Sequence, residues 1–410
     1  MKSIFSFLAL LIFSLNAFSQ ELSNDAWLDD LQIYKRGLEQ KHINGFNKIS
    51  KTDFNAALEQ IKATLGEKSD LETIIDLMRL TRKIGDGHTA ISLRNQETHN
   101  YPIELKNFNG DWKVVKVCKN DSDLLGMKLT GIDELGMQEV VGKVENVAQF
   151  VENEYSKIIR TAQYITSSEV LFGLGICGNK TSGTFRFEDE YCVQTTRSFT
   201  ALSEAENEEV FSEISIGAPE IQVPGNPEFE HFWYAPIEGT DALYIHFESY
   251  PAFEEMMKIS EEIVAYIFQN NIRQLVIDMR NNGGGDLYVG LVLANALNLA
   301  DPVDWKSGVY VLCDNVTFSA ATSNTALFRE LLNAKIVGEP TGSNPTGYQD
   351  MDTFELPNSK LVVCYSKRLF RIQEVATQGV QPDIPIKYEW ESYSQGKDNM
   401  LEWVIGEIRE

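Results

Sequence analysis

The feature that most restricts the fold is the regular alternation of short strand-like runs and longer helical runs after residue 231. We expect strands at 242–250, 274–278, 309–312 and 334–338, with helices at 253–270, 287–299 and 320–333 between them. Strands that alternate with helices of this length are typical of layered α/β domains. The sequence therefore predicts an α/β core that covers residues 231–410.

The pattern of apolar and polar residues is different before residue 231. Residues 20–95 are helical in pattern, and Ser69-Asp70-Leu71-Glu72 is a capping box that starts one of the helices. Residues 96–165 alternate apolar and polar side chains around the turn Asn109-Gly110, which predicts a small β-rich module. Residues 166–230 are rich in glutamate and end in a loop with several prolines, so we expect a connection between domains.

The N-terminus has the pattern of an export signal. A single basic residue, Lys2, precedes an apolar run from Ile4 to Leu15, and small residues flank Phe18 at a cleavage site. The apolar run is too short to span a membrane. We therefore expect residues 1–19 to be a signal peptide that is cleaved after Ser19, and the mature protein to be periplasmic or secreted.

Charge and cysteine content exclude several classes of function. The formal net charge of −24 opposes binding to phosphate backbones, so we expect no nucleic-acid partner. The five cysteines are widely spaced and form no CxxC or Cys/His cluster, so we expect no metal site. A single disulfide between Cys177 and Cys192 is one pairing that the sequence allows, whereas Cys313 and Cys364 lie in apolar runs typical of buried thiols.

Ser319 stands where a predicted strand turns into a predicted helix. A serine at that point is most often a helix N-cap. The first N–H groups of a helix have no partner within the helix, and the helix dipole adds partial positive charge there. An oxyanion formed by attack of the Ser319 hydroxyl could therefore be held by the N–H of Ala320. Both roles, cap and nucleophile, are compatible with this position.

Two other segments contain candidate functional residues. Residues 281–286 (NNGGGD) follow a buried strand, and they match neither a dinucleotide-binding fingerprint nor a P-loop. They form either a tight turn or a backbone cradle for a ligand. His88 lies between Gly87 and Thr89, where its side chain could face a cleft and act as a base near neutral pH. His246 is the main competing histidine, and we expect it to pack in the core.

As a set these residues resemble the S41 serine peptidases, the family of the tail-specific proteases and the tricorn core. The motifs DGHT (86–89), LVIDMRNNGGGD (275–286), VYVLCDNVTFSAA (309–321), KIVGEPTGS (335–343) and QGVQPDI (378–384) follow in family order. The resemblance implies a crotonase/ClpP-like α/β core, an N-terminal helical domain and a PDZ-like module. It also implies hydrolysis of peptide bonds through an acyl-enzyme at Ser319, without a cofactor.

The family has two branches that differ in the base. The tail-specific branch uses a lysine, for which Lys335 and Lys360 are the candidates here, but residues 336–359 contain no lysine. The tricorn-like branch uses a histidine placed as His88 is, so the resemblance favours a Ser319–His88 pair. A Ser/Lys peptidase and an inactive peptide- or ligand-binding protein on the same fold remain the alternatives.

The resemblance also implies the supporting groups. Glu374 would orient the base, with Gln378 as the alternative. The N–H groups of Ala320 and Gly284 would form the oxyanion hole, and the neighbouring glycines at 283 and 285 would contact the substrate backbone. The substrate would be a peptide or protein, bound at its terminus by the PDZ-like module.

Overall fold

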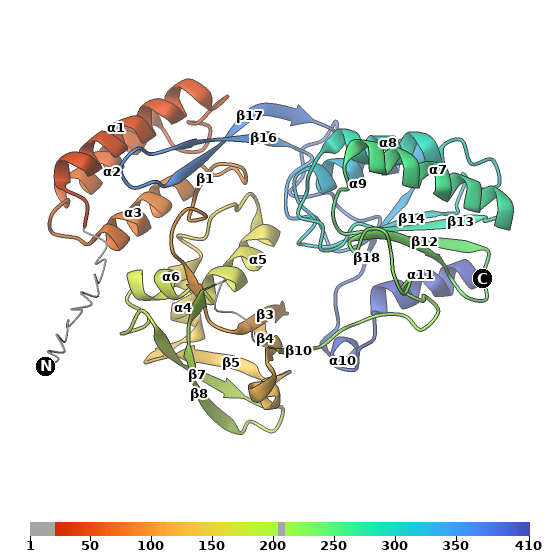
Figure 1. Ribbon diagram of the computed structural model, residues 1–410, viewed down its shortest axis with the longest axis horizontal. Coiled ribbons are helices and arrows are strands. Elements are labelled where there is room, and N and C mark those ends of the chain that lie inside the picture. The colour runs from red at the N-terminus through yellow and green to blue at the C-terminus, as the bar shows by residue number, and fades with distance from the viewer. Residues whose placement is uncertain (1–20, 204–209) are drawn as a thin grey trace, which may run out of the picture.

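The structure is a computed structural model that describes residues 21–203 and 210–410. The predicted signal peptide, residues 1–19, lies outside the described residues. Figure 1 shows an α/β layer structure on one side and a second group of helices and strands on the other, with a long hairpin that joins the two sides. The protein is thus a mixed α/β chain, as the sequence predicts.

The α/β side is built on a six-stranded sheet in the order β11-β12-β13-β14-β15-β18. All neighbours are parallel except β11, which pairs antiparallel with β12 at one edge. The strands are short and nearly all apolar, as expected where both faces of a parallel sheet are covered. Their bounds are Phe232–Pro236, Ala242–Phe247, Gln274–Asp278, Val309–Cys313, Lys335–Gly338 and Ile384–Pro385.

Helices cover this sheet on both faces (Figure 1). Three helices pack on one face around a core of isoleucine, leucine and valine side chains: α7 (Phe253–Asn270), α8 (Leu287–Leu297) and α9 (Ala320–Leu332). The other face is covered by α11 (Asn399–Arg409), with the short α10 (Trp390–Tyr393) beside it. The strand and helix positions predicted after residue 231 are confirmed to within a few residues.

A second sheet belongs to the β-rich module. Its main order is β10-β4-β5-β7-β8, with β3 and β6 paired to β4 and β5. The predicted hairpin is present, because β3 and β4 are joined by Asn109 and Gly110, both at positive φ. The strands are β3 (Ile103–Phe108), β4 (Asp111–Cys118), β5 (Lys128–Ile132), β6 (Leu135–Gly136), β7 (Ser182–Glu188), β8 (Gln194–Thr200) and β10 (Phe211–Glu213).

The module extends further along the chain than the sequence suggests. Strands β7 and β8 complete its sheet, although they lie in the segment 166–230 that we expected to be a connection. Three helices pack against the sheet and share its core: α4 (Met137–Val144), α5 (Glu154–Ile165) and α6 (Ser168–Gly173). Short elements complete this side, namely a 3₁₀ turn (Lys119–Leu124), β2 (His99–Asn100) and β9 (Leu202–Ser203).

The disulfide considered from the sequence is absent. Cys177 is buried in the core of the module, whereas Cys192 is exposed in the turn between β7 and β8. Neither Cys177 nor Cys192 takes part in a disulfide. Burial raises the pKa of Cys177 to about 11, so this thiol stays protonated.

The N-terminal helices are α1 (Asn24–Lys41), α2 (Lys51–Ala63) and α3 (Asp70–Arg82). The predicted capping box is confirmed, since Ser69 and Glu72 cap each other's backbone at the start of α3. These helices do not close a core by themselves. Their hydrophobic cluster includes Leu356, Leu361 and Val363 from the C-terminal part of the chain.

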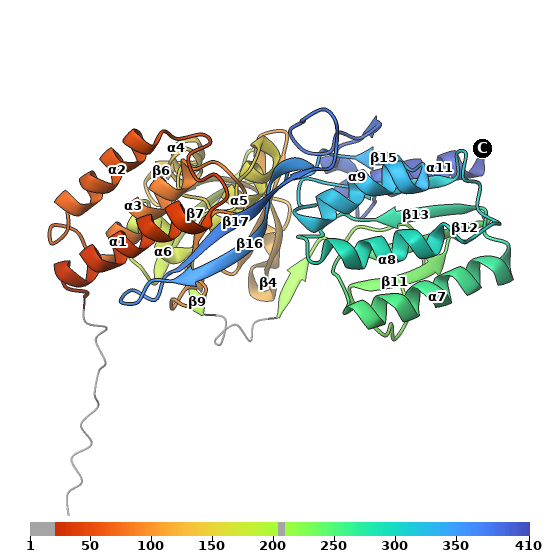
Figure 2. The same cartoon turned by 90° about the horizontal axis from the view of Figure 1, so that it is seen from above.

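Those residues come from a long hairpin of β16 (Thr346–Glu355) and β17 (Val362–Arg371). The hairpin leaves the α/β side, crosses to the N-terminal helices and pairs with β1 (Ala90–Ser92) in a three-stranded sheet (Figures 1 and 2). At its far end the buried Asp30 carboxylate of α1 accepts hydrogen bonds from the backbone N–H groups of Asn358 and Ser359, at 3.0 and 2.7 Å.

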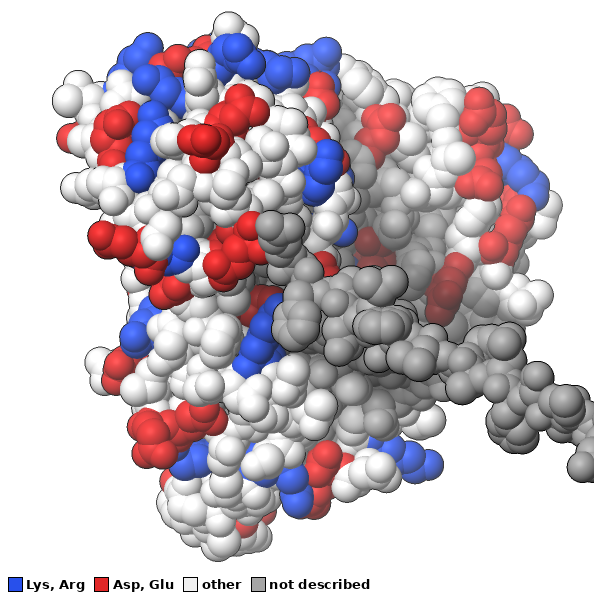
Figure 3. Space-filling view, turned by 60° about the vertical axis from the view of Figure 1, so that its left-hand side comes forward, with Lys and Arg blue, Asp and Glu red and all other residues white. Residues whose placement is uncertain are grey.

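The surface carries mixed charge. On the face in Figure 3, lysine and arginine side chains are scattered among aspartate and glutamate. In the described part of the chain, no helix is long and apolar enough to cross a membrane.

The Asp30 contact yields a stability prediction. Asp30→Ala leaves two part-buried N–H groups of the hairpin without their acceptors, so we expect the free energy of unfolding to fall by about 1–2 kcal/mol. Chemical denaturation measures the change. Gln32→Ala, at an exposed position of the same helix, is the control and should cost about 0.5 kcal/mol or less. Equal effects of the two substitutions would contradict this role of Asp30.

Candidate active site

Ser319 occupies a strained turn between β14 and α9. Its backbone has φ 53° and ψ −121°, a region that residues with a side chain rarely adopt. It stands at the N-cap position of α9, yet its side chain makes no capping hydrogen bond. The simple cap interpretation is therefore wrong. A nucleophile on a sharp strand-to-helix turn is the arrangement in which a serine hydroxyl projects from a sheet edge.

Neighbouring hydroxyl groups hold this turn in place. The Ser319 N–H donates to Ser343 Oγ at 2.7 Å, and Ser343 Oγ lies 2.8 Å from Thr322 Oγ1. The Ser319 carbonyl accepts from the Ser323 N–H at 3.1 Å. The main-chain groups of the strained residue thus have partners, while its hydroxyl is left for another contact.

That contact is with His88. The Nε2 atom of His88 lies 2.8 Å from Ser319 Oγ, although the two residues are 231 positions apart. His88 follows α3 in the loop before β1, and its ring packs against Phe318 with centroids 5.3 Å apart. The structure thus brings together the two residues that the sequence analysis paired.

A buried carboxylate fixes the loop that carries His88. Asp86 accepts hydrogen bonds from the His88 N–H at 2.9 Å, and from Thr89 Oγ1 and Ser366 Oγ at 2.8 Å. It also lies 2.8 Å from Nε2 of the buried His42. Burial alone would raise the pKa of Asp86, but these partners, His42 above all, hold it below its usual value. Asp86 is therefore ionised behind the catalytic loop.

Burial also determines the protonation of His88. Desolvation lowers the pKa of the ring, and the charge of Asp86 and the main-chain carbonyl of Tyr348 offset this effect only in part. The net pKa lies below the ordinary value for histidine. The ring is therefore neutral at pH 7, which is the form that accepts a proton from a hydroxyl.

The structure does not bring Glu374 to His88. Glu374 is exposed in the segment after β17, and within the described ranges no hydrogen bond or ion pair joins it to the histidine. Gln378, the alternative, is exposed as well. The Nδ1 atom of His88 is buried and has no hydrogen-bond partner among the described residues. The resemblance alone placed Glu374 here, and the path of the chain after β17 carries it to the surface.

Residues 281–286, the glycine loop, lie directly against Ser319. Gly284 has φ 104°, and a Cβ atom there would lie 2.7 Å from Ser319 Cβ, so only glycine fits. Its N–H donates to Asn282 Oδ1 at 2.9 Å. The expected oxyanion donor at Gly284 is thus already engaged. The exposed Gly283 and Gly285 have N–H groups for which no partner occurs among the described residues.

The lysines of the alternative mechanism have other contacts. The Lys335 ammonium lies 5.2 Å from the ring centre of Tyr310 on the neighbouring strand. Lys360 is at the far end of the β16–β17 hairpin, where it pairs with Glu355 at 3.5 Å. His246 stacks on Trp233, with ring centroids 4.9 Å apart, but it is only half-buried and its Nε2 lies 3.4 Å from Glu248 Oε2. The expectation that it packs in the core is therefore wrong.

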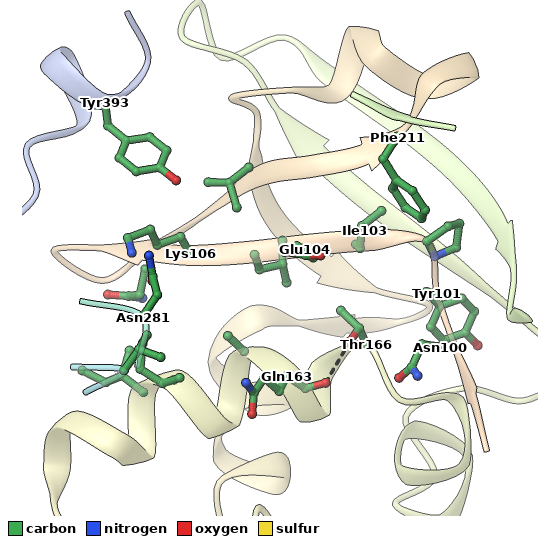
Figure 4. A pocket seen from close by; sticks show the side chains of 18 residues that line it. Asn100, Tyr101, Ile103, Glu104, Lys106, Gln163, Thr166, Phe211, Asn281 and Tyr393 are labelled. Carbon is green, nitrogen blue, oxygen red and sulfur yellow. Dashed lines mark hydrogen bonds between the residues drawn. The ribbon is translucent and has the colours of Figure 1, made fainter. Parts of the chain in front are cut away.

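Two cavities are lined by residues of the segments that contain Ser319 and the glycines 283–285. One of about 360 Å³ has Ser319 and Ala320 in its wall, with Tyr288 of α8 and Arg368 and Phe370 of β17 around it. The second, of about 620 Å³, is a groove between β3 and α5. Figure 4 shows Asn281 of the glycine loop at the Lys106 end of this groove and Tyr101 at the other end. In the described part of the chain, no group of three or more histidine, cysteine, aspartate or glutamate side chains could hold a metal ion.

Sequence reasoning missed several residues of this site. Asp86 lies inside the DGHT motif, yet no pattern shows that it would bind His42 and Ser366. The partner of the Ser319 N–H, Ser343, lies in another quoted motif and had no assigned role. These contacts join residues from five separate segments, so local spacing carries no signal for them.

Comparison with known proteins gives two results. Residues 294–386, which include Ser319 but not His88, match the family model of peptidase family S41. Among solved structures, mature CPAF complexed with lactacystin is similar with a TM-score of 0.67 at 13% identity, covering 94% of this chain and 98% of that one. A second structure of mature CPAF gives a TM-score of 0.66 at 14% identity, covering 93% and 96%. At 13–14% sequence identity, the structural similarity shows a shared fold and nothing more specific.

The support of the serine turn can be tested through Ser343. Ser343→Ala removes the acceptor of the Ser319 N–H, so we expect the free energy of unfolding to fall by about 1–3 kcal/mol. Chemical denaturation measures this change. A fall below about 0.5 kcal/mol, the usual range for surface substitutions, would contradict the assigned contact.

Proposed function

We propose that the chain is a serine-type peptidase in which Ser319 is the nucleophile and His88 the general base. The match of residues 294–386 to peptidase family S41 supports the reaction class. The observation that carries this proposal is the 2.8 Å contact between His88 Nε2 and Ser319 Oγ. A neutral imidazole within hydrogen-bond distance of a serine hydroxyl is the pairing that activates such a nucleophile.

The reaction would proceed through an acyl-enzyme. His88 Nε2 takes the proton of the Ser319 hydroxyl as Oγ attacks the carbonyl carbon of the peptide bond. The tetrahedral intermediate collapses when His88 returns this proton to the leaving amine, which breaks the C–N bond. A water molecule, activated by the same ring, then hydrolyses the ester and restores the serine.

The oxyanion would be held by main-chain donors. Ala320 is the first residue of α9, so its N–H lies in the turn that has no acceptor within the helix. The second donor would come from Gly283, because the N–H of Gly284 is bound to Asn282. The absence of a side chain at Gly284 lets the glycine loop approach Ser319 closely enough for both donors to act.

The substrate would be a peptide or protein chain held in extended form. We propose that the β-rich module is PDZ-like and that a peptide adds to the edge of β3 in the groove beside α5. Among the described strands, β3 pairs only with β4, so its other edge can accept main-chain hydrogen bonds. Asn281 of the glycine loop and Val316, which lies three residues before Ser319, line the same groove.

We further propose that the protein is exported. The support is the sequence pattern of residues 1–19, with Lys2 followed by an apolar run and small residues at the cleavage point. Hydrolysis would then act on extracytoplasmic peptides or proteins.

The catalytic assignment is tested with a fluorophosphonate probe, which reacts with activated serines. Wild-type protein should label, and Ser319→Ala should abolish labelling. His88→Ala should slow it by at least about 10²-fold, the usual contribution of a general base. Lys335→Ala, the control for a Ser/Lys pair, should label at a rate close to that of the wild type.

Other outcomes support the alternatives. Loss of labelling in Lys335→Ala, with labelling retained in His88→Ala, would indicate a Ser/Lys peptidase. No Ser319-dependent labelling in folded wild-type protein would contradict catalysis and favour a protein that only binds peptides.

The groove yields a separate prediction. Gln163 is exposed on α5 and lines the groove, so Gln163→Trp should obstruct a bound strand without disturbing the core. We expect KM for a long peptide substrate to rise about tenfold, while labelling of Ser319 by the small probe is unchanged. Glu154→Trp, exposed on the same helix but outside the groove lining, is the control. An unchanged KM would contradict peptide binding in this groove.

A further inference from the structure

A second buried carboxyl group lies behind the catalytic histidine and takes no part in the mechanism above. Glu152 precedes α5 and is 8% exposed. Its side chain covers two glycines, since a Cβ atom at Gly87 would lie 2.8 Å from Glu152 Cβ, and one at Gly347 would lie 2.4 Å from Oε1. A side chain at Gly347 would displace the Glu152 carboxyl group, and one at Gly87 would displace both Glu152 and Phe318.

These two glycines flank the catalytic ring in the structure. Gly87 is the residue before His88, and Gly347 is the residue before Tyr348, whose carbonyl acts on the ring. The Glu152 side chain therefore packs against both the main-chain segment that carries the imidazole, through Cβ and Oε2, and the segment of Tyr348, through Oε1. Two buried polar atoms in this region, Glu152 Oε2 and His88 Nδ1, have no hydrogen-bond partner among the described residues.

The charges around Glu152 favour its neutral form. Burial raises the pKa of Glu152 to about 8, and the negative charge of Asp86 adds to this effect. The amide groups of Asn344 and the charge of Lys48 act in the opposite direction without cancelling it. Two carboxyl groups thus share this buried region, and Asp86 is the one that ionises.

We propose that Glu152 is a positioning residue for His88, whose protonated carboxyl group holds the Gly87 and Gly347 segments in the arrangement that directs the imidazole to Ser319. This inference rests on the proposed function, because it concerns how the base of that reaction is held. A neutral carboxyl group fills the space that the two glycines leave without placing a second negative charge beside Asp86.

Ionisation of Glu152 would undo this arrangement. A second buried carboxylate would repel Asp86 and draw water into the contact with the glycines. His88 itself faces Asp86, Arg160 of α5 and Asp350 of β16, and none of these is a counter-ion for Glu152. The activity of Ser319 should therefore decline at alkaline pH as Glu152 loses its proton.

The test is the pH profile of Ser319 labelling by the fluorophosphonate probe, measured from pH 5 to pH 9.5. In the wild type we expect the rate to fall about tenfold between pH 7 and pH 9, as a group with a pKa near 8 ionises. Glu152→Gln keeps the shape of the neutral acid but cannot ionise, so its rate should show no such fall. Glu154→Gln, at an exposed neighbouring position, should keep the wild-type profile.

A second variant separates positioning from mere structure. Glu152→Ala removes the group that holds both segments, so we expect kcat on a peptide substrate to fall about tenfold or more with little change in KM. If this variant does not fold, the pH profile of Glu152→Gln still tests the role of Glu152. An alkaline fall that persists in Glu152→Gln, or wild-type kcat in a folded Glu152→Ala, overturns the inference. Absence of Ser319-dependent labelling in the wild type would instead refute the proposed function itself.

Discussion

The ionised carboxylate of Asp86 is the interaction on which the site depends. Four partners from separate places in the chain surround it: His42 after α1, Ser366 on β17, and the His88 and Thr89 of its own loop. A buried charge is tolerated only when such partners replace water. The same carboxylate therefore joins the N-terminal helices to the long hairpin and fixes the loop that presents His88.

The turn at Ser319 depends on a different constraint, which is the close approach of two backbone segments. The turn at Ser319 is strained, and the glycine loop must lie within contact distance of it. Asp314 holds both segments, because it accepts from the N–H groups of Asn281 and Thr317 at 3.2 and 3.1 Å. A buried Arg280, paired with Asp278 and Asp398, anchors the strand end from which the glycine loop departs. Strain at one residue is thus offset by many ordinary hydrogen bonds around it.

The sequence predicted the positions of helices and strands better than the contacts between distant parts of the chain. Strand and helix positions after residue 231, the capping box at Ser69 and the turn at Asn109 follow from local patterns, and the structure confirms them. The resemblance to S41 peptidases is confirmed by the family match. Long-range contacts have no local signal, so the hairpin that joins the N-terminal helices and the role of Asp86 were not foreseen. Glu374 was misplaced because the resemblance fixes an order of motifs but not the path of the chain between them.

The arrangement also links the groove to the catalytic residues through one helix. Residues of α5 form one wall of the groove, while Asn153 at its N-terminal end donates to the Thr341 carbonyl and to Asn344 Oδ1, at 3.2 and 3.1 Å. The segment 341–344 includes Ser343, the partner of the Ser319 N–H. Because Asn153 bonds to this segment at the start of α5, one wall of the groove and the turn at Ser319 are held by the same short stretch of backbone. A peptide bound as proposed would therefore be aligned with Ser319 by rigid elements.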